Sequence, residues 1–154
     1  MEGLNEYLIP YVISQIVSVI ILIVAMKRTK ATRILFALLF FSAFCANMYL
    51  GLVKPNDYLD YGELAIPLYR DFIYGWFSKY VSILIPIIAT GQLLIAIGIL
   101  LKGFIVKIAC IGIILFLLAI APLMVGSAFP FSITVSIAAF MVLKKKDLNY
   151  VWKS

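Results

Sequence analysis

One stretch without any charged residue constrains the fold of this chain most strongly. It covers residues 108–143, which is 36 consecutive positions. A single α-helix of that length would measure about 54 Å, whereas the hydrocarbon core of a bilayer is about 30 Å thick. The stretch must therefore fold back on itself. Pro122, Gly126 and Pro130 predict the turn, with Pro130 suited to the first turn of the following helix.

Three further apolar runs precede this stretch, at residues 7–26, 34–53 and 80–101. Each has about the 20 residues that a helix needs to cross a bilayer. Together with predicted helices at 106–125 and 129–143, they indicate one domain over residues 1–154. The predicted fold is an all-α integral membrane bundle of five transmembrane helices. The fifth is short, and the lysines that follow it can extend it by snorkelling.

Composition agrees with a membrane protein and argues against a nucleic-acid partner. Hydrophobic residues make up 65% of the chain and charged residues 13%, against about 25% charged residues in soluble domains. A small soluble domain could not bury that much apolar surface. The net charge is +6, but the basic residues flank the apolar runs and form no basic stripe, so we expect no nucleic-acid binding.

The distribution of basic residues predicts the orientation of the bundle. Only three of the thirteen, Lys54, Arg70 and Lys79, fall in segments that lie outside if the N-terminus is outside. Cytoplasmic loops carry the excess of Lys and Arg in membrane proteins. The sequence therefore predicts an outside N-terminus and a cytoplasmic C-terminus.

The residues that usually perform catalysis are scarce. The chain has no His, so we expect no metal and no haem. Cys45 and Cys110 lie in apolar runs at different predicted depths, which favours two free thiols. The chain has no CxxC, no phosphate-binding glycine loop and no GxSxG. We therefore find no recognisable catalytic constellation, and the sequence argues against an enzyme.

Most of the polar side chains between the apolar runs lie in the outer segment, residues 54–79. From Pro67 onward its large apolar residues repeat with helical spacing, which predicts an amphipathic helix leading towards the third transmembrane helix. Two interpretations of its aromatic residues stay open. One is an aromatic belt at the membrane surface, which is common. The other is a lid over a pocket, built from Tyr58, Tyr61, Tyr69, Arg70, Tyr74 and Trp76.

Two of the three amides inside the predicted transmembrane helices are Asn47, in the second helix, and Gln92, in the third; the other is Gln15, in the first. An amide in hydrocarbon needs a hydrogen-bond partner, so Asn47 and Gln92 should face the bundle interior. They can hold helices together or contact a ligand. No ionisable residue lies mid-membrane, which argues against an ion-coupled pump.

From about residue 33 to residue 143 the chain resembles the DoxX-like membrane proteins. The resemblance rests on Arg33 at the start of the second helix, the polar and aromatic outer loop, the stretch GQLLIAIGILL at 91–101, and the proline-broken final hairpin. It implies a four-helix core with the first helix outside it. It also implies a place in the inner cell membrane beside redox or quinone chemistry. That family usually has Glu where Gln92 stands, which weakens any role needing a carboxylate there.

The leading hypothesis is an accessory or ligand-binding subunit for an amphipathic, largely apolar molecule such as a quinone or a lipid. Its partners would be the lipid bilayer and a membrane or redox subunit, and a homo-oligomer stays open. A passive transport component for a small solute is the alternative, and a stand-alone enzyme has the least support. The candidate binding residues are Asn47, Tyr49, Tyr69, Arg70, Trp76, Tyr80 and Gln92.

Overall fold

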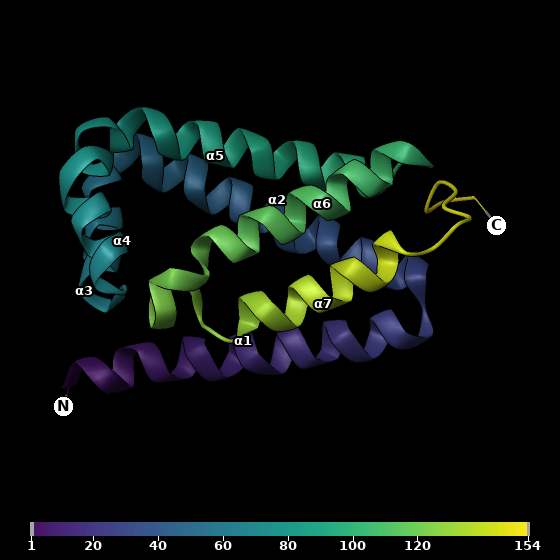
Figure 1. The fold of residues 1–154 in the computed structure, drawn as a ribbon, viewed down its shortest axis with the longest axis horizontal. Helices are drawn as coiled ribbons and strands as arrows, with labels where there is room; N and C mark the ends of the chain where they lie inside the picture. Colours follow the sequence, from purple (N-terminus) through teal and green to yellow (C-terminus); the bar gives the residue numbers. More distant parts are fainter. Residues whose placement is uncertain (1, 154) are drawn as a thin grey trace.

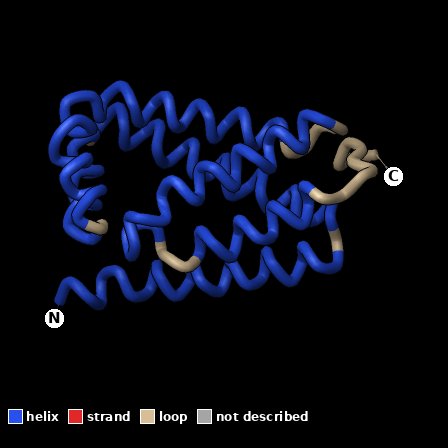
Figure 2. The backbone as a smooth tube through the Cα atoms, viewed as in Figure 1, coloured by secondary structure: helices blue, strands red, loops and turns tan. Residues whose placement is uncertain are grey.

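A computed structural model describes residues 2–153, with side chains described from Tyr7 onward; residues 1 and 154 of the predicted domain lie outside it. The described chain is almost entirely helical and contains no strand (Figure 2). Its long helices are α1 (Glu2–Lys27), α2 (Thr29–Val53), α5 (Ser78–Gly98), α6 (Phe104–Ile120) and α7 (Phe131–Leu143). Its short elements are η1 (Pro55–Asp60), α3 (Tyr61–Leu64), α4 (Pro67–Phe72), η2 (Ile73–Phe77) and η3 (Ala121–Ser127).

Four helical segments within the described chain are long and apolar enough to cross a membrane: Tyr7–Lys27, Thr29–Val53, Pro67–Gly98 and Phe104–Ser127. The prediction of an all-α, multi-pass membrane bundle is confirmed at this level. The fifth apolar helix, α7, has 13 residues and is therefore about 20 Å long. Its crossing of the membrane stays a prediction.

The bounds of the long helices differ from the apolar runs at the charged ends. α2 starts at Thr29, well before residue 34, because only Arg28 leaves the helical conformation (φ −141°, ψ 92°) between α1 and α2. Hydropathy alone misses a helix that continues into Lys and Arg residues, which have good helix propensity. α5 ends at Gly98, and Gly103 turns the chain into α6 with φ 58°.

The outer segment is a chain of short helical turns. α3 and α4 lie across the ends of the other helices rather than along them (Figure 1). The helix expected from Pro67 is present as α4, and it runs through η2 directly into α5. η2 is a single π-helical turn. We call the segment from η1 to η2, residues 55–77, the lid.

The core lies between α2, α5, α6 and α7, and α1 packs against α7. Its most buried side chains include Phe36, Phe40 and Ile113, which are 0–2% exposed. The Tyr11 hydroxyl and the Gln15 amide of α1 donate to the carbonyls of Phe129 and Ala128, at 2.8 and 2.5 Å. α1 is therefore part of the bundle, a point that the sequence left open.

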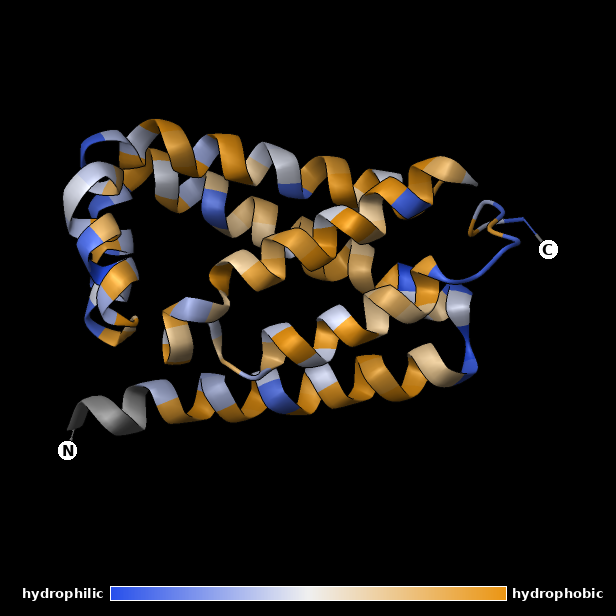
Figure 3. Cartoon of the chain, in the orientation of Figure 1, coloured by the Kyte–Doolittle hydropathy of each residue, from blue (hydrophilic) through white to orange (hydrophobic). Residues whose placement is uncertain are grey.

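Polar residues gather at the two ends of the bundle (Figure 3). The aromatic end comprises the lid and the turn before α7. The basic end comprises the α1–α2 turn, the α5–α6 turn and the C-terminal segment. Ten of the thirteen basic residues lie in these segments or in the adjoining helix ends: Lys27, Arg28, Lys30, Arg33, Lys102, Lys107, Lys144, Lys145, Lys146 and Lys153.

One buried cation joins the segments of the basic end. Arg33 is 1% exposed. Its guanidinium donates to three backbone carbonyls, those of Ile99 (2.8 Å), Leu101 (2.6 Å) and Asn149 (2.7 Å). Because a buried charge must be hydrogen-bonded, these carbonyls explain how Arg33 is accommodated. The side chain ties α2 to the α5–α6 turn and to the C-terminal segment.

The glycine that permits a close helix contact is Gly51 in α2, and not Gly91 of the Gly91–Gly98 pair in α5. Gly91 and Gly98 lie on one helix face, but a Cβ at Gly91 would meet nothing within 4 Å. A Cβ at Gly51 would lie 2.5 Å from Ile85 Cγ2. Gly51 therefore permits the close approach of α2 and α5.

Candidate functional site

A cavity of about 490 Å³ lies beneath the lid. Its walls come from α2 and α5 on one side and from α6 and η3 on another, and the lid covers it. η3 continues from α6 up to the lid, where it contacts α3.

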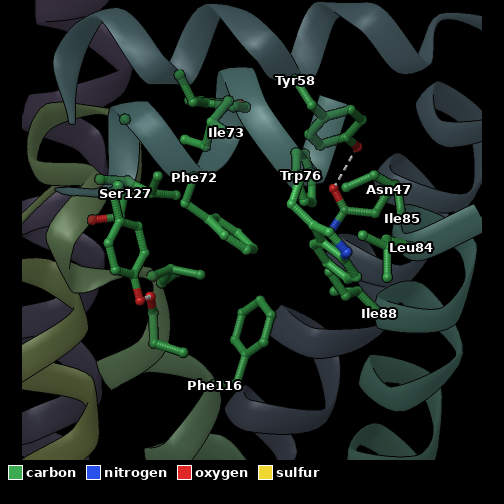
Figure 4. A pocket seen from close by; sticks show the side chains of 17 residues that line it. Asn47, Tyr58, Phe72, Ile73, Trp76, Leu84, Ile85, Ile88, Phe116 and Ser127 are labelled. Carbon is green, nitrogen blue, oxygen red and sulfur yellow. Dashed lines mark hydrogen bonds between the residues drawn. The ribbon is translucent and has the colours of Figure 1, made fainter. Parts of the chain in front are cut away.

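The walls of the cavity are mostly apolar. Phe72, Trp76 and Phe116 point into it from the lid and from α6 (Figure 4). Phe72 and Trp76 are stacked, with ring centroids 5.7 Å apart, and they are 45% and 53% exposed. Both residues therefore line the cavity and also reach the surface of the protein. The other apolar lining residues include Ile73, Phe77, Leu84, Ile85, Ile88, Ala119, Ile120 and Leu123.

A chain of three polar side chains reaches the cavity wall. The Tyr58 hydroxyl donates to Asn47 Oδ1 at 2.7 Å, and Asn47 Nδ2 donates to Gln92 Oε1 at 2.8 Å (Figure 4 shows the first bond). Tyr58 and Asn47 line the cavity, whereas Gln92 is 2% exposed and lies behind Asn47. Each bond uses one donor or acceptor site of Asn47, so one amide hydrogen and one lone pair of Asn47 remain free for a guest.

Two further hydrogen bonds hold the lid to the α6–α7 hairpin. The Tyr69 hydroxyl donates to the Ala119 carbonyl at 2.8 Å, and the Ile66 amide donates to the Pro122 carbonyl at 3.1 Å. With the Tyr58–Asn47 bond, they attach the lid on two sides of the cavity. The lid is therefore attached to both α2 and α6.

Two glycines let aromatic rings of this end pack closely. A Cβ at Gly126 would lie 2.7 Å from Tyr61 Cδ1, and a Cβ at Gly62 would lie 2.8 Å from Tyr74 Cζ. Gly126 and Tyr61 both line the cavity. The Arg70 side chain donates to the Gly62 carbonyl at 3.3 Å and so connects α4 to α3.

The backbone beside the cavity has unusual conformations. Met124 and Ala128 have positive φ angles of 55° and 54°, which cost a non-glycine residue about 1–3 kcal/mol each. Three residues of the π-helical turn, Ile73, Trp76 and Phe77, line the cavity. Strained residues and π-helical turns both concentrate at functional sites.

Burial raises the pKa of two tyrosines of the lid, Tyr58 and Tyr61. The pKa of Tyr58 is raised to about 12, mainly by burial and further by Tyr61 and Asp57. The pKa of Tyr61 is also raised, by burial first and then by Tyr7 and Asp60. The Tyr58 hydroxyl therefore remains a hydrogen-bond donor throughout the physiological pH range.

The structure divides the seven candidate residues into three groups. Asn47, Tyr69 and Trp76 line the cavity, and Gln92 supports Asn47 from behind. Tyr80 contacts Trp76 from outside, with ring centroids 5.2 Å apart. The last two candidates do not line the cavity either: Arg70 is bonded to the lid backbone, and Tyr49 is 64% exposed on α2.

Sequence reasoning missed several cavity residues. Phe116 and Ile88 stand in uniformly apolar helices, where no pattern separates a cavity wall from a surface that faces lipid. Tyr58, Tyr61, Tyr69 and Trp76 fit the lid interpretation, whereas Tyr74 and Tyr80 do not line the cavity and suit an aromatic belt.

Both cysteines are free, as expected from their positions in the sequence. Cys110 is buried, whereas Cys45, which the sequence also places in an apolar run, is exposed. No protein-family model, curated protein or solved structure matches this chain.

Proposed function

We propose that this chain binds an amphipathic, largely apolar molecule, a quinone or a lipid, in the cavity beneath the lid. In this proposal it acts as a ligand-binding or accessory subunit of the DoxX-like kind. The observation that supports it most is the Tyr58–Asn47–Gln92 chain, which ends at the wall of an otherwise apolar cavity. Sites for small apolar molecules typically combine such walls with a few fixed polar groups.

The dimensions of the cavity favour a compact head group. A volume of about 490 Å³ lies within the range of about 300–1,000 Å³ for small-molecule sites. A ring with one carbonyl oxygen fits this space, because its oxygen can accept the free amide hydrogen of Asn47. An attached chain would leave beside Phe72 and Trp76, both of which are about half exposed.

The proposal includes five transmembrane helices in the inner cell membrane, with the N-terminus outside. α7 completes its crossing through the three lysines that follow it, which reach the interface by snorkelling. The turn between α6 and α7 then lies at membrane depth. Irregular backbone is tolerated there where it is buried in protein or lines a cavity, and η3 lines this one.

The role beside a redox enzyme follows from the resemblance alone. It predicts that the chain co-purifies with a membrane subunit that oxidises or reduces the bound quinone. The chain itself offers the cavity and its hydrogen-bonding groups.

The transport alternative has less support from the packing. Phe36, Phe40, Ile99 and Ile113 are 0–2% exposed and belong to the core between the two ends of the bundle. A passage for a solute would need these side chains to move. A proteoliposome flux assay tests this alternative, which predicts a leak that depends on the protein.

Native mass spectrometry of the protein released from mild detergent tests the binding proposal, with a short-chain benzoquinone and phospholipids as probes. Ile88→Trp fills the cavity and should abolish ligand retention. Ile87→Trp is the matched control, because its neighbour Ile87 is 61% exposed and does not line the cavity. Equal retention by both variants and the parent would show that the cavity is not the site.

A further inference from the structure

A second cavity, a cleft of about 680 Å³, lies at the basic end, opposite the lid. It lies between the start of α2 and the segment that follows α7. Three of its nine lining residues are basic, and among these lining residues Asp147 carries the one carboxylate. The lining residues are Arg28, Thr29, Lys30, Ala31, Arg33, Ile34, Asp147, Leu148 and Asn149.

The N-terminus of α2 opens into this cleft without a cap. Arg28 is the N-cap residue, it makes no capping hydrogen bond through its side chain, and the first turn of α2 has no acidic residue. The amide of Thr32 bonds back to the Arg28 carbonyl, but the amides of the three preceding residues have no intrahelical partner. These amides carry the positive end of the helix dipole, which attracts anions.

The basic side chains add to this positive potential, and neutral groups hold two of the three in place. Among the described residues Arg33 donates only to backbone carbonyls, so its charge is hydrogen-bonded and not neutralised by them. Lys30 Nζ donates to the Lys153 carbonyl, which leaves two of its three hydrogens for another acceptor. Three cations and one carboxylate leave the lining with an excess of two positive charges.

We propose that this cleft binds the phosphate group of an anionic lipid. The phosphate would accept hydrogen bonds from Arg28, Lys30 and the free amides at the start of α2. Basic clefts at the ends of transmembrane helices are typical sites for anionic head groups, and charge-assisted bonds to phosphate are strong. This site and the cavity beneath the lid are independent of each other.

The surface next to the cleft favours a lipid over a free anion. Ile34 lines the cleft, is 43% exposed and lies five residues further along α2 than Thr29. That distance is about 7.5 Å along the helix axis. The basic rim is thus followed directly by exposed apolar surface of a helix that is long enough to span a membrane. A glycerol backbone and acyl chains would lie along that surface.

Native mass spectrometry in mild detergent measures the binding directly, with phosphatidylglycerol, phosphatidylcholine and inorganic phosphate as separate probes. We expect phosphatidylglycerol to remain bound at concentrations where the zwitterionic lipid does not. Inorganic phosphate at the same concentration should not displace it. Displacement would overturn the lipid assignment and show a site for a free anion.

A pair of double variants locates the site. Arg28→Gln with Lys30→Gln should weaken phosphatidylglycerol binding about tenfold, the effect of losing about one charge-assisted hydrogen bond. Lys144→Gln with Lys145→Gln removes the same charge from exposed residues of the same end that do not line the cleft. This control should change the affinity less than about twofold.

Equal losses of phosphatidylglycerol affinity in the two double variants would overturn the cleft as the binding site. They would indicate a general attraction of the anionic lipid to the basic end. Arg28 and Lys30 are both exposed, so their substitution should leave the fold intact, and thermal unfolding checks this. If the double variant unfolds, Arg28→Gln alone carries the test, because the Arg28 side chain makes no hydrogen bond to the described residues.

Discussion

The two ends of the bundle bury polar side chains in different ways. At the basic end, the Arg33 guanidinium binds three main-chain carbonyls, whose positions the α5–α6 turn and the C-terminal segment determine. At the aromatic end, Tyr58, Asn47 and Gln92 bind one another beside a cavity, through side chains alone. Bonds to the main chain of fixed turns stabilise the fold. A chain of side chains at a cavity wall keeps unused donors and acceptors, so it can also bind a guest.

The largest expected effect tests the structural role of Arg33. Arg33→Ala removes three hydrogen bonds at about 1 kcal/mol each and leaves buried carbonyls without a donor, so we expect a loss of about 3 kcal/mol in the free energy of unfolding. Arg33→Lys retains the charge with fewer well-placed donors, so its free energy of unfolding should lie between those of the parent and Arg33→Ala. Denaturant unfolding in detergent, followed by circular dichroism, measures both.

Arg28→Ala is the matched control, because this exposed neighbour should change the stability by no more than about 0.5 kcal/mol. Equal free energies of unfolding for Arg33→Ala and the control would contradict a structural role for Arg33 at the basic end. The comparison between the ends would also fail if folded Arg33→Ala selectively lost the ligand bound beneath the lid.

A smaller loss of stability is expected at the wall of the lid cavity, where it tests how rigidly α2 and α5 are packed. Gly51→Ala places a Cβ 2.5 Å from Ile85, a cavity residue, and such overpacking costs about 1–3 kcal/mol. Gly91→Ala in α5 meets open space and should gain up to about 1 kcal/mol from helix propensity. Thermal unfolding compares the two. Equal melting temperatures would show that α2 and α5 separate easily.

The smallest effect is a pH dependence confined to the lid. Below about pH 10 Tyr58 is neutral whether the lid is closed or unfolded, so its contribution is constant. Between about pH 10 and its raised pKa of about 12, only the unfolded form ionises, and the stability of the lid falls as the pH rises. Trp76 fluorescence in a Trp152→Phe background measures this decrease.

Tyr58→Phe separates this change from the titration of lysines in the same range. The variant should reduce the loss seen above pH 10, with the remainder due to Tyr61 and the lysines. It should also weaken ligand retention moderately, since Asn47 loses one partner. An identical pH profile in both proteins would show that the Tyr58 hydroxyl does not stabilise the lid.

The sequence predicted the helical elements better than the site. Hydropathy located the apolar helices, because about 20 apolar residues have few other uses, and it also placed Asn47 and Gln92 in the interior. It could not pair them with Tyr58, because that bond depends on how the lid folds over α2. Tyr49 and Arg70 look like site residues by type, and only the rotation of their helices shows that they point elsewhere.

Arg33 illustrates the same limit at the basic end. The sequence shows a basic residue at the start of an apolar run, which suggests a residue at the membrane surface. The structure shows it buried, because the C-terminal segment folds back over it. No local pattern encodes a contact between residues more than 100 positions apart.

The position of η3 makes the size of the lid cavity depend on the connection between α6 and α7. Because η3 both lines the cavity and contacts α3 of the lid, a change in the length of this connection would move a wall of the cavity and an attachment of the lid together. Point substitutions in the walls alter how a guest is oriented, whereas insertions and deletions in the hairpin alter how large a guest can be. In the binding role proposed above, variation in the length of this connection would therefore be a direct route to a different ligand.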